Sequence, residues 1–236
     1  MLTINNKKID QFKSKLIDRK IESNEVITVD DWLDGSIQPV FIRQQESFKS
    51  IKLSILLIGD DENDAYMQFS KLTKELKNGE LKFDDINLTF KVFINGVVSP
   101  KRLKPNVFEI EYTLKSGYGM TAEKTISREA GSDNTFTIDN SGTAPTPCII
   151  EIMPFQDIIS LTIKGVSQKE IKINNITGGQ KVVINGEENS ILMNDQNGFA
   201  NFDGWEFPRL NPGLNTVKVS TTLGYAMNIK YRSRYI

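Results

Sequence analysis

The side chains that most often carry enzyme chemistry are scarce in this sequence. Histidine is absent, which excludes a Ser-His-Asp triad, a Cys-His pair and an HExxH zinc site. The single cysteine, Cys148, allows neither an internal disulfide nor a cysteine-based metal cluster. It stands next to an apolar run, which favours a small buried residue over a reactive thiol. Carboxylate-pair chemistry and lysine chemistry remain open.

Acidic residues gather at three places along the chain. The stretch "DDENDA" (residues 60–65) offers oxygen ligands at alternate positions, but Ala65 and Lys71 stand where an EF-hand loop needs Gly and Glu. An acidic first turn of a helix explains this stretch better. The pairs Asp30-Asp31 and Asp84-Asp85 consist of adjacent residues, which point to opposite faces of a strand. Neither pair forms an acid/base site by itself, and a partnership between distant carboxylates stays open.

One glycine pattern could indicate a nucleotide. "GYGMTA" (residues 117–122) matches G-x-G-x-x-A, but the residues after it carry no apolar helical stripe, and a Rossmann loop must open a helix. We therefore predict no catalytic, cofactor-binding or metal-binding residue and no enzymatic activity. Partner-binding residues cannot be assigned from the sequence.

The two tryptophans, Trp32 and Trp205, are the candidates for ligand contact. Exposed aromatic rings on a β-sandwich can stack on sugars, but an aromatic at such a position more often closes the edge of a core. In "WEFPRLNPGLNTVKVS" (residues 205–220), the prolines and the Pro212-Gly213 turn lead into an alternating strand. We predict that Trp205 or Phe207 packs over the core there.

Composition narrows the class of partner. The chain has 236 residues, 39% hydrophobic, and a net charge of −1. Residues 1–129 hold 20 basic and 20 acidic side chains, and residues 130–236 hold 9 and 10. Neither half has the basic excess of a phosphate-backbone binder, so no sequence-specific nucleic-acid partner is expected. The start lacks the apolar core of a signal peptide and "ILLIG" is too short to span a bilayer, which predicts no membrane association and synthesis in the cytoplasm.

Short alternating runs separated by turn signals predict a mainly β protein. "VFEIEYTL" (residues 107–114) alternates with period two, and Asn95-Gly96 and Asn185-Gly186 each predict a tight hairpin. One helix is predicted at residues 62–77, because Ala65, Phe69, Leu72 and Leu76 form an apolar stripe. It would be capped by Asp60 or Asp61 and ended by Asn78-Gly79.

A polar segment, "SREAGSDN" (residues 127–134), separates the two halves of the chain. We predict two domains: residues 1–130, β-rich with the single helix (α+β), and residues 131–236, a β-sandwich of short strands with turns about every ten residues.

Several motifs in sequence order resemble the siphophage distal tail protein family. They are "SFKSIKLSILLIGDDENDAYMQFSKLTKELKNGELKFDD" (residues 47–85), "NSGTAPTPCIIEI" (140–152), "ITGGQKVVINGEEN" (176–189) and "WEFPRLNPGLNTVKVS" (205–220). The resemblance covers nearly the whole chain.

This resemblance implies a structural virion protein at the distal end of a long, non-contractile phage tail. It implies a hexameric ring formed by the N-terminal domains, with a galectin-like C-terminal β-sandwich outside, joining the tail tube to the tail tip or baseplate. The implied partners are further copies of the chain, the tail tube protein, the tail-tip hub protein and receptor-binding proteins. No cofactor is implied. The alternatives are a carbohydrate-binding module and a glycosidase acting at the host cell surface.

Overall fold

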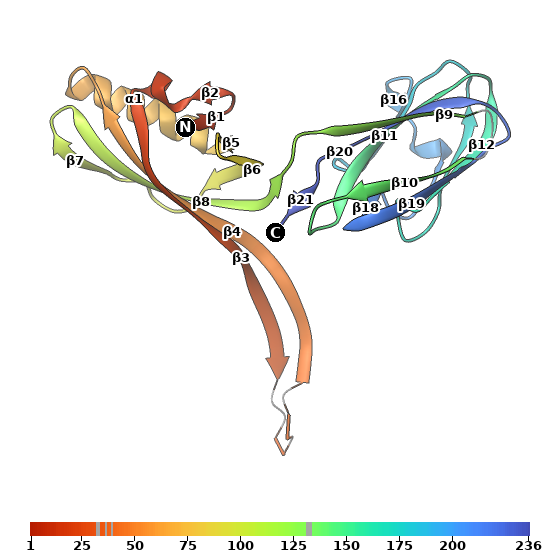
Figure 1. Ribbon diagram of the computed structural model, residues 1–236, viewed down its shortest axis with the longest axis horizontal. Helices are drawn as coiled ribbons and strands as arrows, with labels where there is room; N and C mark the ends of the chain where they lie inside the picture. The colour runs from red at the N-terminus through yellow and green to blue at the C-terminus, as the bar shows by residue number, and fades with distance from the viewer. Residues whose placement is uncertain (32–33, 36, 39, 131–133) are drawn as a thin grey trace. The chain divides into compact units, whose positions relative to one another are not determined.

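The computed structural model describes residues 1–31, 34–35, 37–38, 40–130 and 134–236. Contacts divide the chain into two compact units, residues 1–120 together with Ile236, and residues 121–235. The described residues form antiparallel sheets and one α-helix, α1 (Glu62–Leu76), so the predicted mainly β fold with one helix is confirmed (Figure 1).

The first unit is built on one antiparallel sheet. Its strands follow the order β2-β1-β5-β6-β8-β4-β3, and β7 pairs with another stretch of β8. A 3-10 turn, η1 (Ile9–Phe12), precedes the longest hairpin. The strands are β1 (Leu2–Ile4), β2 (Lys7–Lys8), β3 (Ser14–Asp31), β4 (Val40–Ile58), β5 (Asn78–Phe83), β6 (Ile86–Ile94), β7 (Pro100–Lys104) and β8 (Val107–Met120).

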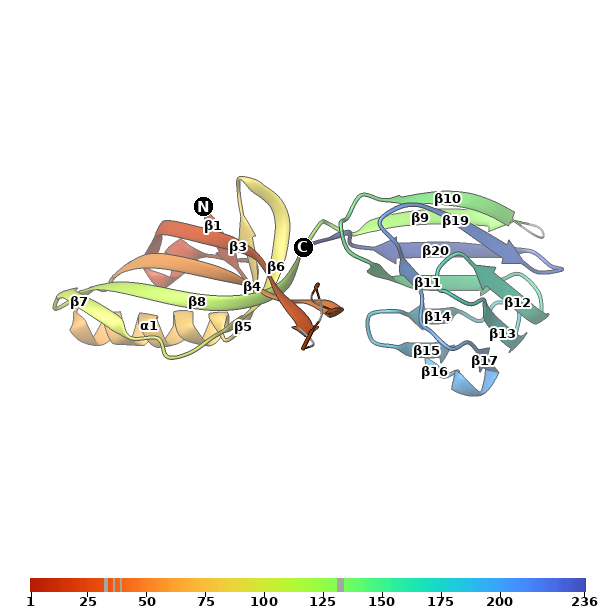
Figure 2. The ribbon, with the colours of Figure 1, turned by 90° about the horizontal axis from the view of Figure 1, so that it is seen from below.

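Helix α1 packs its apolar stripe against this sheet, alongside β8 (Figure 2). Ala65, Leu72 and Leu76 are fully buried and Phe69 is partly buried, as the spacing predicts. The Asp61 side chain accepts the backbone N–H of Asp64 at 2.7 Å and caps the helix. The predicted end of the helix at Asn78-Gly79 is wrong. Lys77, which follows the helix, has right-handed backbone angles, and both Asn78 and Gly79 belong to β5, so no left-handed glycine ends the helix.

The hairpin of β3 and β4 extends well beyond the rest of its sheet (Figure 1). Strand β4 pairs with β8 only as far as Lys49 opposite Ser116. Beyond that point, residues 25–31 and 40–48 pair only with each other. We call residues 25–48 the arm. At its root, the Asn24 side-chain amide donates to the carbonyls of Ser47 at 2.8 Å and Gly117 at 3.1 Å, which ties β3 to β4 and β8.

The second unit is a β-sandwich with its own core (Figure 2). One sheet has the order β10-β19-β12-β13-β17, and the other has the order β16-β15-β14-β11-β20-β9 with β18 pairing to β11. Isoleucine and valine side chains from both sheets pack together in the space between the sheets. They include Ile163, Val217, Ile150 and Ile229. The predicted β-sandwich in the second half is therefore present.

The strands of the second unit are mostly short. They are β9 (Lys124–Ala130), β10 (Asn134–Asn140), β11 (Thr146–Pro154), β12 (Ile158–Lys164), β13 (Ile171–Ile176), β14 (Val182–Asn185), β15 (Ser190–Met193), β16 (Gln196–Asn197), β17 (Phe202–Asp203), β18 (Arg209–Leu210), β19 (Gly213–Ser220), β20 (Tyr225–Tyr231) and β21 (Arg234–Tyr235), with a 3-10 turn η2 (Phe199–Asn201).

The division between the units differs from the predicted one at 130/131. Contacts place it after Met120, ten residues earlier, because β9 pairs along its whole length with β20 of the sandwich. The predicted break at 127–134 thus begins inside a strand, and its residues 131–133 lie outside the described part of the chain. Strand β9 was missed because its sequence, "KTISREA", is mostly polar and exposed.

The two Asn-Gly signals have different outcomes. Gly96 has a positive φ of 89°, but β6 pairs with β5 and β8, so the hairpin predicted at Asn95-Gly96 is wrong. Asn185-Gly186 does join a hairpin, β14 to β15. Its loop is longer than a two-residue turn, and Asn189 rather than Gly186 takes the positive φ. Gly213 has a φ of 85°, as the predicted Pro212-Gly213 turn requires.

Candidate functional site

The one cysteine is structural. Cys148 has no exposed surface and lies in the sandwich core, as predicted. Burial raises the pKa of its thiol far above the ordinary value, so the reactive thiolate is not formed at neutral pH. Among the described residues no group of three or more acidic or cysteine side chains could hold a metal ion, and no helix there is long and apolar enough to cross a bilayer.

The acidic stretch at residues 60–65 serves the start of α1. Lys13 forms ion pairs with Asp60 and Asp64, the latter at 2.9 Å. The Lys13 hydrogen bond, together with those from the Asp60 backbone N–H and the Gln68 amide, lowers the pKa of Asp64 to about 2. The carboxylates are thus used by a helix N-terminus and its neighbour, as predicted for this stretch.

The adjacent acidic pairs also have separate roles. The Arg19 guanidinium donates two hydrogen bonds to the Asp85 carboxylate, and the distance from Arg19 Nη1 to Asp85 Oδ1 is 2.7 Å. Asp84 lies 3.3 Å from the N-terminal amine. Asp30 and Asp31 are exposed at the end of β3. The glycine pattern at residues 117–122 lies at the end of β8 and no helix follows it, so the context of a nucleotide loop is missing.

The prediction that Trp205 or Phe207 packs over the core is confirmed for Phe207 and not for Trp205. The Trp205 side chain is 84% exposed, and the ring that covers the core is Phe207, which is half-buried and stacks on Phe202 with 5.3 Å between centroids. Spacing alone could not separate the two rings, because residues 204–208 form a loop rather than a strand. Trp32 lies outside the described residues.

The arm carries apolar side chains that its own two strands cannot bury. Phe41 and Ile42 are 61% and 58% exposed. Further exposed apolar residues on the arm are Val26, Ile27, Ile37, Val40 and Phe48. An exposed apolar surface of this kind is typical of a protein contact.

Charge is unequally distributed within the first unit. The arm holds five acidic residues and one basic residue, Arg43, a net charge of −4. The other residues of 1–120 hold 17 basic and 13 acidic side chains, a net charge of +4. The arm and the body of the unit therefore have opposite charge, although the unit as a whole is neutral.

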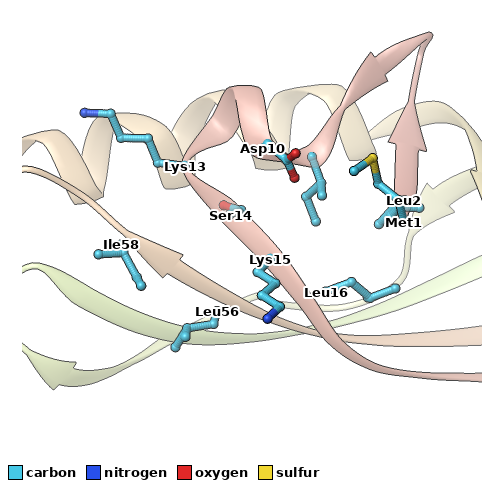
Figure 3. Close-up of a pocket in the computed structure, with 10 residues that line it drawn as sticks. Met1, Leu2, Asp10, Lys13, Ser14, Lys15, Leu16, Leu56 and Ile58 are labelled. Atoms are coloured by element: carbon cyan, nitrogen blue, oxygen red, sulfur yellow. The ribbon is translucent and has the colours of Figure 1, made fainter.

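An apolar cleft of about 550 Å³ opens beside the start of β3 (Figure 3). Leu16 of β3, Leu56 and Ile58 of β4, and Met1, which precedes β1, line it, and Lys15 of β3 is also a lining residue. The remaining lining residues are Leu2, Ile9, Asp10, Lys13 and Ser14. Strand β3 is also the last strand in the sheet order, so the cleft lies next to an edge strand. An edge strand beside an apolar cleft is a surface suited to another polypeptide.

One known family model matches most of the second unit. Residues 141–235 match the family model described as the C-terminal domain of the siphovirus-type tail component. This stretch is therefore similar to a domain of structural tail components, which are not enzymes. The match lies within the sandwich formed by residues 121–235.

The fold of the whole chain also has known counterparts. It is similar to phage SPP1 Dit, described as a paradigm of the hub adsorption apparatus in phages infecting Gram-positive bacteria, with a TM-score of 0.80, 11% identity and coverage of 100% of this chain and 98% of that chain. Two structures of the phage P2 baseplate in its activated conformation, with Ca and with Sr, have TM-scores of 0.52 at 10% identity and cover 92% of this chain and 90% of theirs. The resemblance to distal tail proteins is thus confirmed in the second unit by sequence and along the chain by fold. No curated protein matches the chain.

Proposed function

We propose that this protein is a distal tail subunit that forms a closed ring between the tail tube and the tail tip of a long-tailed, non-contractile phage. The observation that carries the proposal is the agreement in fold with SPP1 Dit over 100% of the chain. The tail component match over residues 141–235 supports it independently through sequence. The proposed partners are copies of the same chain, the tail tube protein, the tip hub and receptor-binding proteins.

The arm supplies a physical reason for self-association. An isolated two-stranded ribbon is at best marginally stable in water, and residues 25–31 and 40–48 are such a ribbon. Its exposed rings and aliphatic chains, Phe41 and Ile42 first among them, would remain in water in a monomer. Docking on a neighbouring copy buries them and stabilises the ribbon.

Charge favours the body of the neighbour's first unit as the docking surface. The arm has a net charge of −4 and the body of the first unit has a net charge of +4. Opposite charge of this kind steers two protein surfaces together. The cleft beside β3 is the proposed receiving surface, since apolar side chains and Lys15 line it together. A contact between two different surfaces is heterologous, and repeated around an axis it closes into a ring.

The second unit is proposed to lie outside the ring, as the family resemblance implies. Its core is separate from that of the first unit, because residues 136–231 supply one cluster and residues 2–114 the other. The proposal therefore assigns the ring contacts to the first unit alone.

Removal of the arm tests the proposal. The variant joins Asn24 to Lys49, which face each other across β3 and β4, through an Asn-Gly turn in place of residues 25–48. We expect a monomer by light scattering at concentrations where the unmodified protein forms a ring. The control is Leu214→Arg, at a residue 78% exposed in the second unit, which should leave the ring intact. A ring that persists without the arm contradicts the proposed contact.

A further inference from the structure

The loop between β17 and β18 presents an aromatic ring to solvent. Trp205 is 84% exposed, although Phe202 and Phe207 on either side of it in the chain are partly buried against the sandwich core. A tryptophan offers a large apolar surface that is normally covered. Neither the tail component match nor the proposed ring contact assigns a role to this side chain.

Trp205 is held on an ordered support. The Arg209 backbone N–H donates to the Val166 carbonyl at 2.6 Å, which ties this loop to the turn between β12 and β13. The Gln168 backbone N–H donates to Glu206 Oε2 at 3.1 Å and makes a second tie between the same two segments. Arg209 also pairs with Glu206 at 3.3 Å. These contacts hold the backbone of the loop that carries Trp205, so the loop loses little conformational entropy when a ligand binds there.

The surroundings of the ring are polar. The Lys169 ammonium lies over the Trp205 ring, 4.9 Å from its centroid, and Gln168 and Asp203 nearby in the chain are also exposed. The centre of a protein interface is depleted of charged residues, so this arrangement does not favour a protein partner. Residues 130–236 hold 9 basic and 10 acidic side chains, which does not favour a nucleic acid.

We propose that Trp205 and Lys169 form a saccharide-binding site on the second unit. A hexopyranose has an apolar C–H face that stacks on an aromatic ring and hydroxyl groups around its edge. The indole of Trp205 receives that face when the exposed Lys169 side chain moves from the face of the ring to its edge. From there the Lys169 ammonium and the Gln168 amide donate hydrogen bonds to hydroxyl groups, and the Glu206 carboxylate accepts one. In the tail subunit proposed above, on which this role rests, the site would bind the phage particle to surface glycans.

The test is binding of the full-length protein to an array of oligosaccharides built from glucose, galactose, rhamnose and N-acetylglucosamine, followed by titration calorimetry with the best binder. We expect Trp205→Ala to weaken binding about tenfold or more, Lys169→Ala to weaken it less, and Trp205→Phe to restore part of the affinity. The matched control is Ile159→Ala, which removes an apolar side chain that is 83% exposed on the same unit and should not change binding.

Three results would overturn the site: no binding to any of these sugars, equal binding by Trp205→Ala, or the same loss in Ile159→Ala. A change of oligomeric state in Trp205→Ala without a change in sugar binding would assign the ring to a protein contact instead. The arm-deletion experiment is unaffected by any of these outcomes, so the saccharide site and the ring can fail separately.

Discussion

At the scale of single residues, neighbouring aromatic side chains have opposite environments. Phe207 stacks on Phe202 and packs against the sandwich core, whereas Trp205 is 84% exposed. We expect Phe207→Ala to lower the free energy of unfolding by about 3 kcal/mol, at the lower end for Phe→Ala because the ring is only half-buried. Trp205→Ala should change it by less than about 0.5 kcal/mol. Urea unfolding of both variants makes the comparison, and a larger loss for Trp205→Ala would contradict the assignment of these rings.

Tyr112 links the sheet of the first unit to α1 through a buried hydroxyl. Its oxygen lies 2.9 Å from Thr73 Oγ1, and burial raises the pKa of Tyr112 to about 12. The folded protein then keeps this proton at pH values where the unfolded chain, with a tyrosine pKa of about 10, has lost it. Stability from this group is complete below about pH 10 and falls toward pH 12 by about 1.4 kcal/mol per pH unit.

Tyr112→Phe should remove that part of the alkaline loss. We expect the variant to lose about 1 kcal/mol at pH 7 with the hydrogen bond, and to be less sensitive than the unmodified protein between pH 10 and 12. Denaturant unfolding across this range measures both. Parallel pH profiles for the two proteins would mean that Tyr112 ionises in the folded state as easily as in the unfolded chain.

At the scale of elements, α1 depends on its N-cap. The Asp61 carboxylate accepts the Asp64 backbone N–H at 2.7 Å. We expect Asp61→Ala to cost about 1 kcal/mol of stability, while Asp61→Asn, which retains a capping oxygen, should cost much less. Thermal unfolding measures the difference, and equal losses in the two variants would show that the cap hydrogen bond is unimportant.

The elements also show what a sequence can and cannot predict here. Helix α1 and strand β8 were found because one face of each is apolar and the other polar, as burial of Phe108, Ile110 and Tyr112 in β8 bears out. The arm was missed, since its apolar residues are exposed on both strands and give no pattern of one buried face. In the proposed ring, the surface that stabilises the arm belongs to another chain. Strand β9 was missed because its pairing with β20, rather than burial of apolar side chains, holds it in the sheet.

At the scale of the whole molecule, the division of the chain can be tested with fragments. Strand β9 pairs with all of β20, so a second unit that starts at residue 121 keeps this edge and one that starts at residue 131 loses it. We expect fragment 121–236 to unfold cooperatively and at a clearly higher temperature than fragment 131–236. Equal melting temperatures would favour the boundary at 130/131.

The central claim, that this protein is the ring subunit at the far end of a phage tail, is tested most directly by electron cryo-microscopy of virions that carry it. The account predicts a ring of six copies around a central opening between the tail tube and the tip, with the first unit of each copy in the ring and its arm on the next copy. Density for this protein on the capsid, or its absence from the particle, would contradict the account.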